Sequence, residues 1–290
     1  MRAVVTGARG LVGQRLVRVL AARGHEVVAW SRADVELSDS RSVEAALGKA
    51  KADIVFNPAS MTEVDKCEAD KTRAYRDNVL AAANLGIATN ASRAHLVHVS
   101  TDYVFDGHAG PYREEDAPNP RGVYAKTKRM GEVMIEELAG SFCICRTAVV
   151  YGWPEAARPN FGAWLYGVLS QGKEAKLFSD QFVSPTLADS LAEMLVEIGE
   201  RKLTGMWNVS GADVVSRVDF GHAFCDAFGF DRKLVLPTKI ADMNFASPRP
   251  LHSGLRVDKI RNTLQNKPLS THEAIERFKQ AVRGAPAPAL

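Results

Sequence analysis

Cysteine is scarce in this sequence. The four cysteines, Cys67, Cys143, Cys145 and Cys225, form no Cys-x-x-Cys pair, which argues against a disulfide scaffold and against a cysteine zinc site. Cys143 and Cys145 are two residues apart in an apolar run and would share one face of a strand. We expect buried, reduced thiols.

Long apolar runs and one-sided charge are also lacking. No uninterrupted apolar run approaches the roughly 20 residues that span a bilayer. Residues 1–6 already have the pattern of a strand, so we expect no signal peptide and a cytoplasmic protein. The net charge of +3 comes from 37 basic and 34 acidic residues scattered along the chain. Nucleic acid is not an expected partner because no basic stripe is present, and a membrane is not expected because no apolar run is long enough.

Apolar runs alternate with helical segments over the first half of the chain. Their continuous Val/Ile/Phe content predicts strands that are buried on both faces of a parallel sheet. Gly24 is expected to end the first helix, and Ser40 to cap the second. The expected strands are 3–6, 26–30, 53–57, 95–100 and 142–150. The expected helices are 11–23, 40–48, an Ala-rich segment ending near 92, and 124–138.

The pattern loosens after residue 151, where helices are expected at about 187–201 and 216–228 and a strand at 205–210. We therefore predict an α/β fold, a Rossmann-type doubly wound parallel sheet with a smaller C-terminal substrate-binding lobe. Residues 1–150 would bind NADP(H), with returns from about 178–210, and residues 151–290 would mainly bind substrate. The Pro-rich end, residues 284–290, is expected to be a frayed tail.

A glycine-rich turn joins the first expected strand to the first helix. Gly7, Gly10 and Gly13 stand in a GxxGxxG rather than a GxGxxG pattern. Small residues let the backbone turn tightly and approach a pyrophosphate, which free amides at a helix start then bind. A purely structural turn is the alternative, but its position in the first β–α unit favours a dinucleotide site.

The end of the second strand bears on the choice of cofactor. An acid there would bond the ribose 2′-hydroxyl and repel a 2′-phosphate. Here Trp30 ends the strand, Ser31 and Arg32 follow it, and no acid appears before Asp34. Because Arg32 and Ser31 can both donate to a phosphate, we predict NADP(H) in preference to NAD(H). An exposed surface arginine, or an Asp34 that turns inward, is the alternative.

A tyrosine and a lysine four residues apart, Tyr124 and Lys128, share one face of an expected helix. A phenol, whose ordinary pKa is about 10, catalyses proton transfer poorly at neutral pH unless its anion is stabilised. An ammonium one turn away would lower that pKa and hold the nicotinamide ribose. Thr101 ends the fourth strand, where its hydroxyl would face the ligand crevice and bond a reacting carbonyl. A chance surface pair is the alternative for Tyr124 and Lys128.

Together these features resemble the extended short-chain dehydrogenase/reductase family, and within it the dTDP-4-dehydrorhamnose reductase branch. The resemblance covers nearly the whole chain. Besides the glycine turn, it is carried by residues 57–66 (NPASMTEVDK), 100–107 (STDYVFDG), 111–116 (PYREED), 123–128 (VYAKTK), 146–152 (RTAVVYG), 180–186 (DQFVSPT), 207–211 (WNVSG) and 249–250 (RP).

The resemblance implies reduction of a nucleotide-linked 4-keto-6-deoxy sugar. Tyr124 would protonate the C4 oxygen while the nicotinamide delivers hydride, with Lys128 holding the ribose and Thr101 orienting the carbonyl. Thr101 and Asp102 would also touch the sugar. The residues implied along the dinucleotide are Gly10, Leu11 and Val12 at the pyrophosphate, Trp30 at the adenosine ribose, Glu36 and Leu37 at the adenine, and Ser60, Met61, Thr62 and Val99 along the remainder.

The sequence departs from the family at the substrate. Val149 stands where the reductases have a tryptophan that contacts the substrate, and the loss of this ring removes a large apolar platform. Met61 replaces an aromatic residue or a histidine, and Pro58 and Ser60 replace alanines. The sugar, or its way of binding, is therefore expected to differ.

Two other functions stay open at this point. A nucleotide-sugar epimerase uses the same scaffold but recycles a tightly held NAD. A non-catalytic NADP-binding regulatory subunit, like the β subunit of methionine adenosyltransferase, has similar STDYVFDG-type and Tyr-x-x-x-Lys segments. Turnover of a keto-sugar with stoichiometric use of NADPH would separate the reductase from both. The predicted assembly is a homodimer.

Several other conspicuous residues have ordinary explanations. His95 and His98 would face opposite sides of a strand, so we predict no metal site. The acidic run at 114–116 is expected to be solvated, and a loosely held divalent cation is the alternative. A spacing of four residues places Phe220, Phe224 and Phe228 in a core, whereas Trp153 and Trp164 suit either a substrate cleft or the packing of the second lobe.

Overall fold

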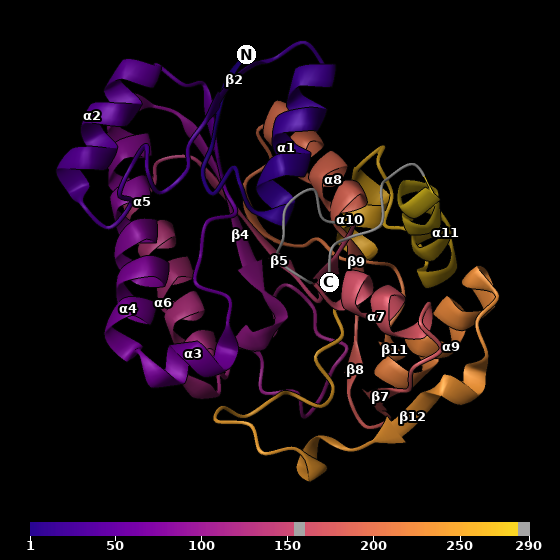
Figure 1. The fold of residues 1–290 in the computed structure, drawn as a ribbon. Coiled ribbons are helices and arrows are strands. Elements are labelled where there is room, and N and C mark those ends of the chain that lie inside the picture. Colours follow the sequence, from indigo (N-terminus) through magenta and orange to yellow (C-terminus); the bar gives the residue numbers. More distant parts are fainter. Residues whose placement is uncertain (154–159, 284–290) are drawn as a thin grey trace.

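The computed structural model describes residues 1–153 and 160–283 (Figure 1). Within them, six parallel strands form the central sheet. In spatial order these are β10 (Gly205–Asn208), β5 (Phe142–Thr147), β4 (His95–Thr101), β3 (Ile54–Asn57), β1 (Arg2–Val5) and β2 (Glu26–Ala29). Every residue of β3 is buried, as expected for a strand that is covered on both faces. The predicted Rossmann-type parallel sheet is confirmed.

Helices cover both faces of the sheet, which makes it doubly wound (Figure 1). On one face, α1 and α8 lie side by side and pack on strand residues such as Val5 and Phe56. On the other face, α2, α5 and α6 pack on the alternate residues, such as Val4 and Val55. The bounds of these helices are Leu11–Ala22 (α1), Ala188–Glu200 (α8), Ser40–Ala50 (α2), Ala81–Ser92 (α5) and Gly122–Leu138 (α6).

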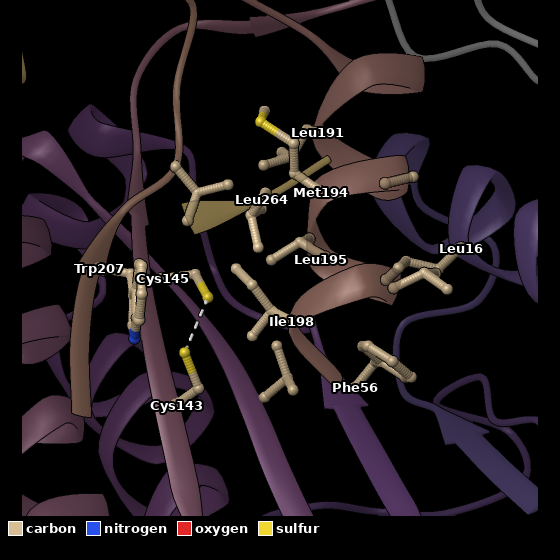
Figure 2. Packing of buried hydrophobic residues seen from close by; sticks show 14 of the residues in the cluster. Leu16, Phe56, Cys143, Cys145, Leu191, Met194, Leu195, Ile198, Trp207 and Leu264 are labelled. Carbon is tan, nitrogen blue, oxygen red and sulfur yellow. Dashed lines mark hydrogen bonds between the residues drawn. The ribbon is translucent and has the colours of Figure 1, made fainter. Parts of the chain in front are cut away.

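Figure 2 shows the core between the sheet and α8. Leu195 and Ile198 point from α8 toward the strands, and Cys143 and Cys145 point toward α8 from β5. The Sγ atoms of Cys143 and Cys145 are 3.5 Å apart. Cys143 and Cys145 point the same way because a strand places residues i and i+2 on the same face. All four cysteines are free and buried, as predicted.

The connection from β3 to α5 contains three short helices where one Ala-rich helix was expected. These are α3 (Val64–Ala69), α4 (Lys71–Tyr75) and the π-helix η1 (Arg76–Leu80). The Asp70 carboxylate accepts a hydrogen bond from Arg73 N at 2.9 Å and caps α4. The π-helix buries two consecutive polar residues, Asp77 and Asn78.

Two local predictions are corrected by the structure. The N-cap of α2 is Asp39 rather than Ser40, because the Asp39 carboxylate accepts from Arg41 N at 3.1 Å and Ser40 is already helical. The strand expected over 142–150 ends at Thr147, because Val149 has a φ of 43°, in the left-handed region outside extended backbone. Gly24, with a φ of 76°, ends α1 as predicted.

The second half of the chain builds a smaller lobe and returns to the sheet through α8 and β10. Phe220 and Phe224 are fully buried in the lobe core beside Tyr151 and Phe278, which confirms their predicted core position. The expected α8, α9 and β10 are present. The other elements are α7 (Phe161–Leu169), α9 (Arg217–Phe228), α10 (Asp258–Thr263), α11 (Thr271–Arg283), β6 (Val150–Tyr151), β7 (Ala175–Phe178), β8 (Phe182–Val183), β9 (Thr186–Leu187), β11 (Val215–Ser216), β12 (Val235–Thr238), and the 3-10 helices η2 (Asp102–Val104), η3 (Arg232–Leu234) and η4 (Ile240–Asp242).

Two further expectations concern the C-terminal tail and membrane-spanning helices. The tail at 284–290, expected to be frayed, lies outside the described residues. Among the helices of residues 1–153 and 160–283, none combines the length and apolar character that crossing a bilayer requires.

A buried ion-pair network fixes α6 to the sheet. The Glu132 carboxylate accepts from Arg146 of β5 through Nε and Nη2, each at 2.9 Å, and from Ser100 Oγ of β4 at 2.6 Å. Arg129 Nη1 adds a fourth contact at 2.9 Å. Burial acts to raise the pKa of Glu132, but the hydrogen bonds and charge of Arg146 outweigh it, so the pKa is lowered.

Glu132→Ala is expected to destabilise the fold by about 3–5 kcal/mol, because it leaves Arg146 buried without a counter-charge. Urea unfolding followed by circular dichroism measures this loss. Glu136→Ala is the matched control, since Glu136 contacts the same Arg129 but lies at the surface and should cost less than about 1 kcal/mol. Equal losses of unfolding free energy in the two variants would contradict a stabilising contribution from the buried network.

Candidate active site

The turn from Gly7 to Gly13 is packed so closely that it excludes side chains. A Cβ added to Gly13 would lie 2.3 Å from Gly7 O, and one added to Gly7 would lie 3.1 Å from Ala59 Cα. Gly10 is the N-cap of α1, and within the described residues no side chain caps the first amides of this helix. Free amides and the helix dipole suit an anionic pyrophosphate, so the turn fits the predicted dinucleotide.

A cavity of about 230 Å³ opens beside this turn, where β1, β2 and β3 end. Eight predicted cofactor residues line it: Gly7, Gly10, Trp30, Ser31, Arg32, Glu36, Leu37 and Ser60. The other predicted cofactor residues lie outside this cavity lining: Leu11, Val12 and Gly13 at the start of α1, Met61 and Thr62 after β3, Val99 in β4, and Tyr124 and Lys128 in α6. Lining residues that sequence reasoning missed are Thr6, Arg9, Val35, Pro58, Ala59, Asp77 and Ala81.

Each of the two residues predicted to select NADP(H) is paired with an acid. Asp34 accepts from Ser31 N at 2.8 Å and from Ser31 Oγ at 2.6 Å. Arg32 Nη2 donates to Asp77 Oδ2 at 2.6 Å, and the Arg32 side chain is 55% exposed. Because Arg32 is anchored at the cavity wall and still reaches solvent, it can turn toward a phosphate.

Asp77 is shared by three arginines. Besides Arg32, Arg76 Nε lies 3.1 Å and Arg73 Nε 3.4 Å from its carboxylate oxygens. One buried carboxylate therefore faces three guanidinium groups, which leaves positive charge in excess beside the cavity. Such a cluster suits a phosphate. Asp77 lies on a π-helix 45 residues beyond Arg32, and no motif in the sequence connects the two.

The three predicted catalytic residues come together at the carboxyl end of β4. Thr101 ends β4, and Tyr124 and Lys128 lie in the first turns of α6. All three are buried, with Tyr124 at 7% and Lys128 at 2% exposure, so a chance surface pair is excluded. The hydroxyls of Thr101 and Tyr124 are hydrogen-bonded, and Lys128 Nζ donates to Val99 O at 2.8 Å.

The ionisation of the tyrosine differs from expectation. Burial raises the pKa of Tyr124, the Thr101 hydrogen bond opposes this shift, and the charge of Asp102 adds to it. The net shift is upward, whereas Lys128 was expected to lower this pKa. Burial in turn lowers the pKa of Lys128 to about 8. Burial therefore has a larger effect on the pKa values of Tyr124 and Lys128 than their spacing of four residues.

The second lobe contributes polar side chains near Asp102. Ser253 Oγ donates to Asp102 Oδ2 at 2.5 Å, and burial raises the pKa of Asp102 to about 6. Arg217 Nε donates to Gln181 Oε1 at 3.0 Å, and its guanidinium carbon lies 4.5 Å from the centre of the Phe161 ring. None of Ser253, Arg217 and Gln181 was predicted as a site residue, although Gln181 lies within the DQFVSPT segment.

Three further residues of interest divide between core and surface. Val149, the predicted substrate contact, packs partly against a small core that contains Phe105 and Tyr112. Trp153 is buried in the core of the second lobe, so lobe packing accounts for it. Trp164 is 39% exposed.

The histidine pair faces two sides of β4, as expected. His95 Nδ1 lies 2.8 Å from Ser141 Oγ, and His98 Nδ1 lies 2.9 Å from Asn57 Nδ2. Across residues 1–153 and 160–283, no three His, Cys, Asp or Glu side chains gather in a way that would hold a metal ion.

The doubly wound sheet, the glycine turn and the buried Tyr124–Lys128 pair define an NADP(H)-dependent oxidoreductase of the short-chain dehydrogenase/reductase class. Residues 1–283 match the family model described as RmlD substrate binding domain. The chain belongs to this family, that of the dTDP-4-dehydrorhamnose reductases.

Individual relatives agree with this assignment. The spore coat polysaccharide biosynthesis protein SpsK of Bacillus subtilis is 34% identical, over 88% of each chain. The dTDP-4-dehydrorhamnose reductase of Mycolicibacterium smegmatis is 31% identical, over 98% of this chain and 86% of the relative. The crystal structure of dTDP-4-dehydrorhamnose reductase from Bacillus anthracis in complex with NADP superposes with a TM-score of 0.91 at 27% identity, covering 97% of this chain and 99% of that one.

Arg32→Ala is expected to weaken NADPH binding about 10-fold or more and NADH binding little, because only NADPH offers a phosphate to the lost guanidinium. Fluorescence titration gives both dissociation constants. Arg41→Ala, on the exposed start of α2, removes the same charge away from the cavity and should change neither constant. An equal loss for both cofactors in Arg32→Ala would argue against the phosphate contact.

Proposed function

We propose that this chain catalyses the NADPH-dependent reduction of the C4 carbonyl of a nucleotide-linked 4-keto-6-deoxy sugar. The observation that carries the proposal is the burial of Tyr124 beside Thr101 and Lys128 at the carboxyl edge of the sheet. Membership of the dTDP-4-dehydrorhamnose reductase family supports the substrate class. dTDP-4-dehydrorhamnose is accordingly the first substrate to test.

Each catalytic side chain has a task that its surroundings support. A bound reduced dinucleotide supplies the hydride. Tyr124 donates its phenolic proton to the carbonyl oxygen, and its raised pKa keeps that proton in place until the carbonyl accepts it. The Thr101 hydroxyl, bonded to Tyr124, orients the carbonyl. Lys128 holds the nicotinamide ribose and stabilises the phenolate that proton transfer leaves.

The proposed cofactor path follows the carboxyl edge of the sheet. The pyrophosphate is held by the turn Gly7, Gly10, Leu11, Val12 and Gly13. The adenosine end lies in the cavity lined by Trp30, Ser31, Arg32, Glu36 and Leu37. The remaining length of the dinucleotide runs past Ser60, Met61, Thr62 and Val99 to Tyr124 and Lys128. Excess positive charge around Asp77 supports NADP(H), with NAD(H) as a weaker ligand.

The proposed division of labour follows the two halves of the chain. Residues 1–150, with returns from about 178–210, bind the cofactor, and residues 151–290 mainly bind the sugar. Thr101, Asp102 and Val149 contact the sugar from the first half. The hydrogen bond from Ser253 to Asp102 supports this arrangement, because it brings the second lobe to the catalytic edge.

The two alternatives have less support. An epimerase retains NAD, whereas the arginines around Asp77 favour a cofactor with an additional phosphate. A regulatory subunit needs no proton donor, whereas Tyr124, Thr101 and Lys128 are all retained and buried together. NADPH oxidation measured against a panel of nucleotide-linked 4-keto sugars separates the three functions, since only the reductase consumes NADPH stoichiometrically.

Tyr124→Phe is expected to lower turnover of the keto-sugar at least 10-fold, because it removes the positioned acid and keeps the ring. NADPH oxidation measures turnover, and fluorescence measures NADPH binding, which should stay within a few-fold. Tyr75→Phe removes a hydroxyl from an exposed tyrosine and is the matched control. Unchanged turnover in Tyr124→Phe would overturn the mechanism.

The proposed cellular form is a cytoplasmic homodimer. Four free cysteines suit a reducing compartment. Leu80, Ile87 and Met130 are large apolar side chains exposed on η1, α5 and α6, which contact one another.

Ile87→Glu is therefore expected to sediment as a monomer in analytical ultracentrifugation, where the parent protein sediments as a dimer. A monomeric parent protein would refute the assembly.

A further inference from the structure

A chain of buried polar side chains crosses the sheet from the glycine turn to the catalytic lysine. Thr6 Oγ1, at the cavity wall, donates to Asn57 Oδ1 at 2.6 Å. Asn57 Nδ2 lies 2.9 Å from His98 Nδ1, and His98 Nε2 lies 3.4 Å from Lys128 Nζ. All four residues are at most 3% exposed, so their polar groups are satisfied by one another rather than by bulk solvent.

The direction of the hydrogen bonds along this chain depends on the charge of Lys128. In the arrangement just given, Asn57 donates to His98 Nδ1, which puts the imidazole proton on Nε2, facing Lys128 Nζ. A neutral amine can accept that proton, but an ammonium cannot. The reverse arrangement suits the ammonium: Lys128 donates to Nε2, His98 Nδ1 donates to Asn57 Oδ1, and Asn57 Nδ2 donates to Thr6 Oγ1. The two differ by a half-turn of the Asn57 amide and a change of histidine tautomer.

We propose that His98, oriented by Asn57, is a positioning residue for Lys128. By changing its tautomer, His98 holds the Lys128 Nζ at the sheet edge in both charge states of the lysine. The inference rests on the proposed function, in which Lys128 must hold the ribose and stabilise the tyrosine anion. A neutral imidazole is suited to this task because one nitrogen accepts while the other donates. Burial and the charge of Lys128 both lower the pKa of His98, which keeps it neutral.

The charged groups around Lys128 leave His98 as its switchable neighbour. On α6, Glu132 is already paired with Arg146 of β5, and Tyr124 is protonated. On η2, Asp102 is bonded to Ser253, and burial and the charge of Asp102 both raise the pKa of Tyr103. On α3, burial keeps Cys67 a thiol, since its pKa is raised to about 11. His98 can supply both an acceptor and a donor to Nζ.

The parent protein offers a test that needs no substitution in the chain. In ¹⁵N-histidine NMR, the two imidazole nitrogens differ widely in shift according to which carries the proton. Between about pH 6.5 and 9.5, His98 should change from the Nδ1–H to the Nε2–H tautomer as Lys128 loses its proton. The signal is assigned by its loss in His98→Gln. His95, on the other face of β4, is the internal control and should keep one tautomer.

Two substitutions test the effect on Lys128 itself, followed by ¹³C NMR of its ε-carbon and assigned with Lys128→Met. His98→Phe removes both nitrogens, so the acid dissociation constant of Lys128 should rise about tenfold, because the ammonium loses a charge-assisted acceptor. His98→Gln keeps a donor and an acceptor and should restore most of the parent value. NADPH affinity should then fall at a lower pH in His98→Phe than in His98→Gln.

The outcomes separate this inference from the proposed reaction, because none of these measurements uses a sugar. A single His98 tautomer across the titration of Lys128 would overturn the inference, even if His98→Phe fails to fold. Identical Lys128 titrations in the Phe and Gln variants would overturn it as well. A protein whose His98 changes tautomer but which reduces no 4-keto sugar would refute the reaction and leave the positioning role standing.

Discussion

The buried ion pair between Glu132 and Arg146 is the constraint on which the geometry of the site depends. It ties the middle of α6 to β5, while Ser100 adds a tie to β4. Lys128 lies one turn before Glu132 and Tyr124 one turn earlier, so the height and rotation of both above the sheet follow from this anchor. The pair lies within a fully buried environment, where breaking it leaves an uncompensated charge. Position is thus maintained by an ion pair that is not itself among the predicted site residues.

Electrostatics in the site follow from burial more than from spacing. The four-residue interval between Tyr124 and Lys128 is visible in the sequence, but solvent exclusion is not, and it dominates both pKa values. The raised pKa makes the Tyr124 phenol a weaker acid, so proton transfer depends on stabilisation of the phenolate that forms. A proton donor should keep its proton in the resting protein, and a desolvated lysine interacts more strongly with an anion that forms beside it.

The predictable parts of the fold are those that local physics determines. Five of the sheet strands, β1 to β5, had continuous apolar runs, and the glycine turn had a backbone requirement that only small residues meet. The region from Val64 to Leu80 lacked such a signal, because α3, α4 and the π-helix are too short for a clear period. Asp77 was missed for the same reason. Its contacts with Arg32 and Arg76 arise from tertiary packing, which no spacing in the sequence encodes.

The second lobe was harder to anticipate because its strands are short and pair irregularly. β8, β9 and β11 contain two residues each, so no alternation can develop. Their role is to bring distant segments together, and the polar residues near Asp102 come from three such segments. Gln181, Arg217 and Ser253 are far apart along the chain, and the contacts among β8, β11 and the loop at Ser253 bring them together.

The backbone at Val149 has a consequence for the sugar contact proposed there. A β-branched residue at a φ of 43° is costly, on the order of 1–3 kcal/mol, and the surrounding chain enforces it. Any side chain placed here inherits the same twist and leaves the main chain along a direction that an extended strand would not give. A larger ring at this position would therefore sweep a different volume above the catalytic edge than a ring on a regular strand. If Val149 contacts the sugar as proposed, the shape that fits depends on this main-chain torsion as well as on side-chain identity.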